Sequence, residues 1–291
     1  MTRLRLTLFV VSAWTALSVL LCRAAPARAE GNCDALTQDQ SARLDALLGK
    51  IHAYNGCDRT LAACLKAPHP HFSVRYAVND VCRLVKANKS NAEIERALAK
   101  RARSLMPALK KISYLDDSRT AAGDPESPVT AVVYACARCP FCRVLVPSLY
   151  HAVTEGRLKG KVRMVFRPFP LKSHEGAVEG ASAMEAAATQ GRFWPMLHLL
   201  YSRYDTFCPA LLPEWAEEVG IPRAAFGAAY ADPRTREALI TSKREGVANK
   251  VVATPTVFIN GVLYDYDMSE DVMEEVLEEA YQCALEGRGK L

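Results

Sequence analysis

The sequence lacks an excess of charge of one sign once its first residues are set aside. It contains 37 Lys and Arg against 32 Asp and Glu, but four of the arginines precede residue 30, which leaves 33 cations for the rest of the chain. Recognition of nucleic acid through its phosphates requires a concentrated surplus of cations. The near balance of charge therefore argues against a nucleic-acid partner.

The start of the sequence also lacks an uncharged run long enough to span a bilayer. The run Leu6–Leu21 has sixteen residues, whereas a spanning helix needs about 20. Two arginines precede this run and a small-x-small site at 27–29 follows it, which is typical of a secretory signal. We expect residues 1–29 to be a signal peptide cleaved near Ala29, and the mature chain to be exported to the periplasm. An uncleaved membrane anchor is the alternative.

Residues 30–107 have the spacing of helices and hold four cysteines. Apolar residues such as Leu44, Leu47 and Ile51 recur at helical intervals, and Asn91 is expected to cap a later helix. The region is too small to bury a large core, so we predict a small all-α domain stabilised by disulfides. Four cysteines allow three pairings, and the sequence does not choose among them. The cysteines are Cys33, Cys57, Cys64 and Cys82.

Two histidines between Cys64 and Cys82 allow another interpretation of these cysteines. His69 and His71 would complete, with those two sulfurs, the donor set of a structural zinc site. Prolines beside the histidines indicate a loop, and disulfides compete for the same sulfurs. We therefore favour disulfides and expect no metal.

After residue 107 the pattern changes to strands that alternate with helices. Residues 108–128, rich in turn formers, are predicted to be a linker or entry segment. The next residues predict two strands with a helix between them, which indicates a parallel crossover and an α/β domain over 129–291. These elements are Val129–Ala135, Cys139–Glu155 and Val162–Phe166. A helical tract is predicted over 175–250. A hairpin over 256–264, turning at Asn260-Gly261, and a final helix capped by Ser269 complete the domain.

Three cysteines at intervals of three, Cys136, Cys139 and Cys142, raise a choice between a metal cluster and disulfide chemistry. The ferredoxin pattern needs a fourth cysteine where this chain has Val146. Covalent haem needs a histidine after the last cysteine, where this chain has Arg143. Disulfide chemistry is therefore favoured, and it needs no cofactor.

The pair in Cys139-Pro140-Phe141-Cys142 has the placement that a reactive thiol needs. It follows a predicted strand and opens a predicted helix, where free N–H groups and the helix dipole favour an anion. Pro140 suits the first turn because it has no N–H to leave unpaired. The thiolate is the reactive form of cysteine. Cys142, three residues on, is close enough to resolve a mixed disulfide.

These motifs carry a family resemblance. Residues 123–142, GDPESPVTAVVYACARCPFC, resemble the entry segment and active site of DsbA-like thioredoxin-fold proteins, and VVATPTVFINGVLY is similar to their cis-proline segment. The resemblance implies a thioredoxin fold with a helical insertion over the tract 175–250. It implies that Cys139 attacks, that Cys142 resolves, and that Pro255 forms a cis peptide bond with Thr254 facing the pair. Phe141 and Thr254 would help to position the site and bind substrate.

The resemblance further implies a periplasmic thiol-disulfide oxidoreductase, either an oxidase or an isomerase. Its substrates would be exported proteins with thiols or disulfides, and a redox partner protein, soluble or membrane-bound, would renew its active pair. Residues 30–107 would serve an isomerase as a homodimerisation domain. They also faintly resemble helical domains of cytochrome-maturation proteins, so a reductant in that pathway is one alternative. A disulfide-stabilised binding or assembly module without exchange activity is the other.

Cys136 departs from the family pattern, which usually has no cysteine there. It is a third redox thiol, a partner for Cys208 or Cys283, or a small buried residue, and the last two options are favoured. The helix dipole contributes up to about 2 kcal/mol and an exposed arginine such as Arg138 about 0.2 to 1 kcal/mol. One pKa unit corresponds to about 1.4 kcal/mol, so we expect the pKa of Cys139 roughly one to two units below its ordinary value, and an intermediate redox potential.

Overall fold

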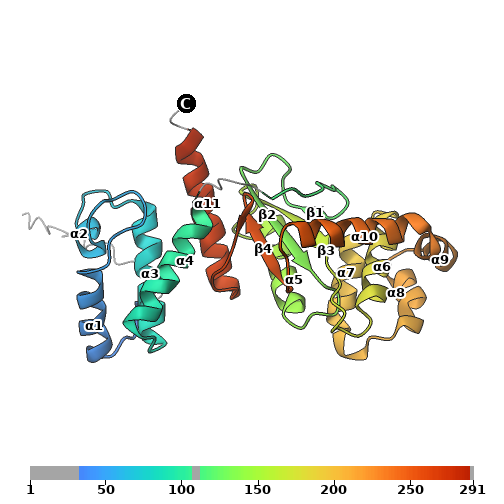
Figure 1. Cartoon of the computed structure of the whole chain (residues 1–291), viewed down its shortest axis with the longest axis horizontal. Coiled ribbons are helices and arrows are strands. Elements are labelled where there is room, and N and C mark those ends of the chain that lie inside the picture. Colours follow the sequence, from blue (N-terminus) through green and yellow to red (C-terminus); the bar gives the residue numbers. More distant parts are fainter. Residues whose placement is uncertain (1–32, 107–111, 289–291) are drawn as a thin grey trace, which may run out of the picture.

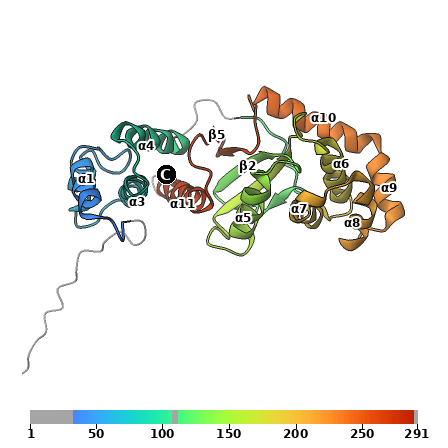
Figure 2. The same cartoon turned by 90° about the horizontal axis from the view of Figure 1, so that it is seen from below.

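Three parts follow one another along the long axis of the molecule: the first helices, a sheet, and a second group of helices (Figure 1). The computed structural model describes residues 33–106 and 112–288. The expected signal peptide, residues 1–29, lies outside the described residues. The last helix, α11 (Glu270–Arg288), lies between the first helices and the sheet (Figure 2).

The first part is helical and carries two disulfides, as predicted. Cys33 is bonded to Cys82, and Cys57 to Cys64. The zinc alternative is therefore wrong, because both of the sulfurs it needed are in disulfides. The helices are α1 (Gln38–Leu48), α2 (Leu61–Leu65), α3 (Phe72–Lys86) and α4 (Asn91–Leu105).

The cap of α4 is Ser90, and Asn91 is its first helical residue. The Ser90 hydroxyl accepts a hydrogen bond from the Glu93 N–H at 3.3 Å, and the Glu93 carboxylate accepts one from the Ser90 N–H at 2.7 Å. This reciprocal pair satisfies two N–H groups that would otherwise be unpaired. Ser90, and not the predicted Asn91, caps the helix because Ser90 has an acidic residue, Glu93, three positions later.

A mixed sheet forms the centre of residues 112–288. Its strand order is β1-β3-β2-β4-β5, with β2 and β3 parallel and the other neighbours antiparallel. The strands are β1 (Ala121–Ala122), β2 (Val129–Ala135), β3 (Val162–Pro168), β4 (Thr256–Ile259) and β5 (Val262–Leu263). The predicted crossover and hairpin are confirmed. The short strand β1 was not predicted, because its two residues lie within a segment rich in turn formers.

The predicted helical insertion lies between β3 and β4, at the end of the molecule away from α1–α4 (Figure 1). Phe193 and Trp194 join it to the sheet: they are 1% and 9% exposed, and both rings pack edge-on against Phe166 of β3. The insertion consists of α6 (Ala177–Ala188), α7 (Phe193–Ser202), η1 (Tyr204–Thr206), η2 (Pro209–Leu211), α8 (Leu212–Glu218), α9 (Arg223–Ala231) and α10 (Pro233–Ala248).

A buried ion-pair network fastens the first helices to the rest of the fold. Arg101 of α4 donates hydrogen bonds to Glu279 of α11 at 2.8 Å and to Asp80 of α3 at 3.1 Å. The Tyr54 hydroxyl donates to Glu279 at 2.6 Å. None of the three charged side chains is more than 1% exposed. Since α11 also packs against β2 and α5 (Cys142–Thr154), this one helix contacts both parts.

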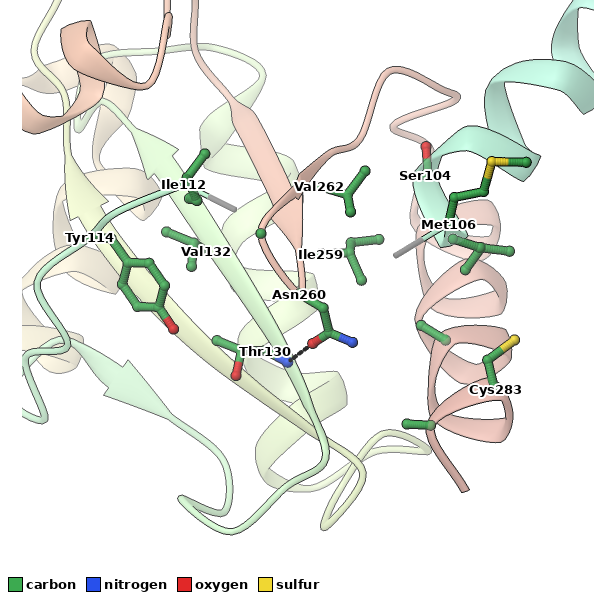
Figure 3. A pocket seen from close by; sticks show the side chains of 14 residues that line it. Ser104, Met106, Ile112, Tyr114, Thr130, Val132, Ile259, Asn260, Val262 and Cys283 are labelled. Carbon is green, nitrogen blue, oxygen red and sulfur yellow. Dashed lines mark hydrogen bonds between the residues drawn. The ribbon is translucent and has the colours of Figure 1, made fainter. Parts of the chain in front are cut away.

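A cavity of about 410 Å³ lies beside this junction, where α4 and α11 meet the edge of the sheet (Figure 3). Ile259 lines it from the β4–β5 hairpin, and Met106 and Cys283 line it from the helices. The side-chain oxygen of Asn260 accepts a hydrogen bond from the Thr130 N–H at 2.9 Å, which holds the hairpin turn against β2. The cysteines of the 136–142 motif do not line this cavity.

Replacing Arg101 by methionine should destabilise the protein by about 3 to 5 kcal/mol, because it leaves Glu279 buried without a cation. Lys100→Met is the matched control, since Lys100 forms an exposed pair with Asp265 that is worth at most about 1 kcal/mol. Urea unfolding of both variants measures the difference. Equal losses of unfolding free energy would show that the buried network does not hold the two parts together.

Candidate active site

The cysteine motif occupies the connection between β2 and α5. The Cys139 N–H donates to the Cys136 carbonyl at 3.2 Å, which closes a turn, and the Arg143 N–H donates to the Cys139 carbonyl at 3.2 Å. α5 begins at Cys142, three residues later than predicted. The delay arises because residues 136–141 turn before the helix starts. Cys139 therefore precedes the helix, and Cys142 lies in its first turn.

The sulfur of Cys139 meets a segment from the other end of the domain. The Cys139 thiol donates to the Thr254 carbonyl at 3.2 Å, and the Cys142 N–H donates to the Cys139 sulfur at 3.4 Å. The Thr254–Pro255 peptide bond is cis. This contact is possible because β4, which follows Pro255, pairs with β2, which leads to the cysteines. The expected geometry of the pair and the cis proline is thus present.

Hydrogen bonds to the Cys139 sulfur determine its acidity. The Cys142 thiol is the largest cause that lowers the pKa of Cys139 to about 5, against burial, which raises it. The Thr254 side chain and the N–H groups of Cys142 and Phe141 lower the pKa further. The Thr254 hydroxyl is buried and has no hydrogen-bond partner among the described residues, so it is free to donate to a thiolate. The pKa is lower than the sequence analysis predicted.

Cys142 has the opposite acidity. It is 0% exposed, and burial, followed by its hydrogen bond to the Cys139 sulfur, raises its pKa well above the ordinary range. The pair therefore consists of one thiolate and one protonated thiol near neutral pH. In such a pair, the first sulfur can attack a disulfide, and the second thiol stays protonated until it resolves the mixed disulfide.

The arginines beside the motif do not supply the expected charge to Cys139. The guanidinium carbons of Arg138 and Arg143 lie 4.3 Å and 4.4 Å from the centre of the Tyr204 ring. Arg143 also pairs with Asp205 at 3.1 Å. These contacts hold both cations against η1 of the insertion. The expectation that arginine helps to ionise Cys139 is replaced by direct hydrogen bonding to the sulfur.

Three exposed apolar side chains belong to the two segments that meet at the Cys139 sulfur. Phe141 is 72% exposed and Val144, one turn along α5, is 63% exposed. Val252, two residues before Thr254, is 87% exposed. Phe141 was expected at the site from the sequence, but the two valines were not, because each lies within an apolar run that predicts a buried element. We name Phe141, Val144 and Val252 the apolar rim.

Residues 33–106 and 112–288 contain neither a metal-binding cluster nor a membrane-spanning helix. No group of three or more His, Cys, Asp or Glu residues in these ranges has the arrangement of a metal site. No helix in this part of the chain combines the length and the apolar character that crossing a bilayer requires.

Within the motif, the Cys136 sulfur lies beside His174, while the Cys139 sulfur faces Thr254.

Thr254→Val should raise the pKa of Cys139 above its value of about 5, because the thiolate loses a hydroxyl donor. Thr256→Val is the matched control, since the Thr256 hydroxyl donates to the Ala253 carbonyl at 2.7 Å. The pH dependence of iodoacetamide alkylation of the reduced protein measures this pKa. In the wild type the rate should rise through a midpoint near pH 5. An unchanged midpoint in Thr254→Val would show that the Thr254 hydroxyl does not lower the pKa of Cys139.

Comparisons with known proteins give a partial relative and two solved structures of the same fold. The chain is 35% identical over 171 residues to the Na⁺/H⁺ antiporter NhaA 3 of Salinispora tropica. This match covers 57% of the chain and 26% of the antiporter, so the chain spans about a quarter of that relative's length. The name of the antiporter therefore describes that longer protein.

Two solved structures resemble this chain in fold. They are a periplasmic thioredoxin-like protein from Salmonella enterica serovar Typhimurium and alpha-DsbA1 from Wolbachia pipientis. Each has a TM-score of 0.50 and 19% identity over 60% of this chain. The matches cover 99% and 95% of those chains. They confirm the DsbA-like thioredoxin fold.

The family model described as thioredoxin matches residues 116–279, which is more than half of the chain. This span contains β1 to β5, the cysteine motif and the helical insertion. It ends inside α11, the helix that also contacts the N-terminal helices. By this match and by its fold, the chain belongs to the thioredoxin family.

Proposed function

We propose that this protein is a periplasmic thiol-disulfide oxidoreductase that exchanges disulfides with exported proteins through Cys139 and Cys142. The observation that carries the proposal is the opposed acidity of the two thiols. The pKa of Cys139 is lowered to about 5, and that of Cys142 is raised. Exchange requires a thiolate to attack and a second thiol to resolve the mixed disulfide. The pair supplies both.

Each residue of the pair has a distinct part in the exchange. In the oxidised protein, a substrate thiolate attacks the Cys139 sulfur and releases Cys142. A second substrate thiolate then attacks the substrate sulfur of the mixed disulfide, and Cys139 leaves as a thiolate. Its low pKa makes it a good leaving group. In the reverse sequence, Cys139 attacks a substrate disulfide and Cys142 resolves the mixed disulfide. The pair is then oxidised, and the wrong substrate disulfide is reduced to two thiols that can pair again.

The acidity of Cys139 supports disulfide donation more than reduction. The pKa of the corresponding cysteine is about 7 in thioredoxin and about 3.5 in DsbA. The pKa of Cys139, about 5, lies between these two values. Stabilising the thiolate stabilises the reduced protein, which makes the disulfide a stronger oxidant. A reductant in cytochrome maturation would instead need a potential near or below that of thioredoxin.

The apolar rim supports unfolded proteins as substrates. Phe141, Val144 and Val252 belong to the segments that meet at the Cys139 sulfur, and all three are more than half exposed. An unfolded chain offers apolar side chains next to its cysteines, and burying them against the rim would hold the chain in place. Thr254 and Pro255 would face the same chain across the sulfur. A separate redox partner protein would then reoxidise Cys142 and Cys139.

We assign the N-terminal helices to a domain over 30–107. Within this domain, α3 and α4 pack against α11 of the same chain. Among residues 33–106, Met106 is the one large apolar residue with an exposed side chain, at 55%. We propose that this domain, together with the entry segment 108–128, braces the thioredoxin domain 129–291. A homodimer through these helices would favour the isomerase role, and sedimentation distinguishes a dimer from a monomer.

Cys136→Ala/Cys142→Ala should capture exported proteins as mixed disulfides with Cys139, because both neighbouring free thiols of the motif are absent. The captured species should disappear on reduction with dithiothreitol and should not form in Cys139→Ala/Cys142→Ala. Non-reducing electrophoresis followed by mass spectrometry detects them. If Cys136→Ala/Cys142→Ala captures nothing and Cys139 resists mild dithiols, the protein is a binding or assembly module without exchange activity.

Val252→Ser should weaken exchange with unfolded proteins more than exchange with glutathione disulfide. Losing about 1 kcal/mol of apolar contact corresponds to roughly fivefold in kcat/KM for the protein substrate. Leu285→Ser, which changes an exposed leucine on α11, is the matched control. Parallel rate measurements with both substrates test this. Equal losses for both substrates would mean that the rim does not bind the polypeptide.

A further inference from the structure

Cys136 is a buried thiol for which the proposed exchange has no use. It is 1% exposed and forms no disulfide. Its sulfur accepts a hydrogen bond from the Arg138 N–H at 3.4 Å. His174, from the loop between β3 and α6, places its Nδ1 atom 3.4 Å from the same sulfur. The expected pairing with Cys208 or Cys283 is absent, since both of these are free thiols.

The spacing of the three cysteines creates two overlapping pairs that share Cys139. Cys136 and Cys139 are three residues apart, as are Cys139 and Cys142. The hydrogen bond from the Cys139 N–H to the Cys136 carbonyl, at 3.2 Å, holds the first pair across one turn. The Tyr201 hydroxyl donates to the same carbonyl at 3.3 Å and fixes the turn from α7. The turn therefore holds the backbone of Cys136 against that of Cys139, the residue that carries the mixed disulfide.

We propose that Cys136 is a second resolving cysteine, with His174 as its base, that can release substrate from Cys139 in place of Cys142. The inference rests on the proposed exchange function. The Cys136 thiol gives its proton to His174 Nδ1, and the thiolate attacks the Cys139 sulfur of the mixed disulfide. The Cys136–Cys139 bond forms and the bond from Cys139 to the substrate breaks. The two cysteines are oxidised to a disulfide, and the substrate leaves as a thiolate that takes up the proton.

The surroundings of Cys136 explain why a base is needed. Burial raises the pKa of Cys136, and the neighbouring Cys139 thiolate raises it further. The N–H groups of Leu171 and Arg138 and the Lys243 ammonium of α10 favour its ionised form. The ionisable side chains that face this sulfur are thus Cys139, Lys243, His174 and Tyr201. Of these, His174 is in hydrogen-bond contact and can accept the proton.

Glutathione disulfide with reduced variants lacking Cys142 tests the proposal. In Cys142→Ala, Cys139 should first take up one glutathionyl group, and Cys136 should then displace it. Peptide mapping should find a Cys136–Cys139 disulfide, and two molecules of glutathione should be released per protein. In Cys136→Ala/Cys142→Ala the glutathionyl group should stay on Cys139. Cys142→Ala/Cys208→Ala is the matched control, which removes an exposed free thiol and should behave as Cys142→Ala does.

His174→Phe in the Cys142→Ala background should slow the displacement about 100-fold at neutral pH, the lower end of what a positioned base contributes. The difference should narrow as the pH rises, because hydroxide then removes the proton. His151→Phe, an exposed histidine of α5, is the control. If displacement in His174→Phe is as fast as in His151→Phe, His174 does not act as the base for Cys136.

Two negative outcomes are distinguishable. If the wild type forms a Cys139–Cys142 disulfide but Cys142→Ala keeps its glutathionyl group as fully as the double variant does, the second resolving role is wrong and the proposed exchange function stands. If Cys139 of Cys136→Ala/Cys142→Ala does not react with glutathione disulfide, the exchange function fails, and the role of Cys136 fails with it.

Discussion

The structure depends on hydrogen bonds that converge on one sulfur atom, that of Cys139. They come from two places in the sequence: from the start of α5, through Cys142 and the Phe141 N–H, and from the side chain of Thr254 just before β4. A thiolate that accepts several hydrogen bonds is stabilised even where burial opposes its charge. The proposed chemistry follows from this stabilisation, because it makes Cys139 both the attacking group and the leaving group.

The rest of the fold positions those donors. Pairing of β4 with β2 brings Thr254 opposite the cysteines, and the stacking of Arg138 and Arg143 on Tyr204 anchors the turn to the insertion. α11 packs on α5 from behind and is held through Glu279 by the N-terminal helices. The N-terminal helices α3 and α4 thus contact α11, which in turn packs against the helix that carries Cys142.

The motifs were predicted correctly from the sequence because each depends on residues that are close together in the chain. The strand–turn–helix around Cys139, the hairpin and the helical insertion each follow from patterns within a few dozen residues. The acidity of Cys139 was underestimated because the orientation of the Thr254 hydroxyl depends on tertiary structure. Arg101 was missed because a charged residue in an amphipathic helix is normally exposed, and only α11 supplies the partner that allows its burial. The contact between Cys136 and His174 joins residues that no motif links.

Disulfide mapping by mass spectrometry across a graded series of glutathione redox buffers tests the central claim most directly. It gives the equilibrium potential of the Cys139–Cys142 pair, which a stabilised thiolate makes more oxidising. The account predicts a midpoint between about −270 mV, the value for thioredoxin, and about −120 mV, that of DsbA. A midpoint at or below that of thioredoxin would contradict the claim that hydrogen bonds to the Cys139 sulfur make this protein a disulfide donor.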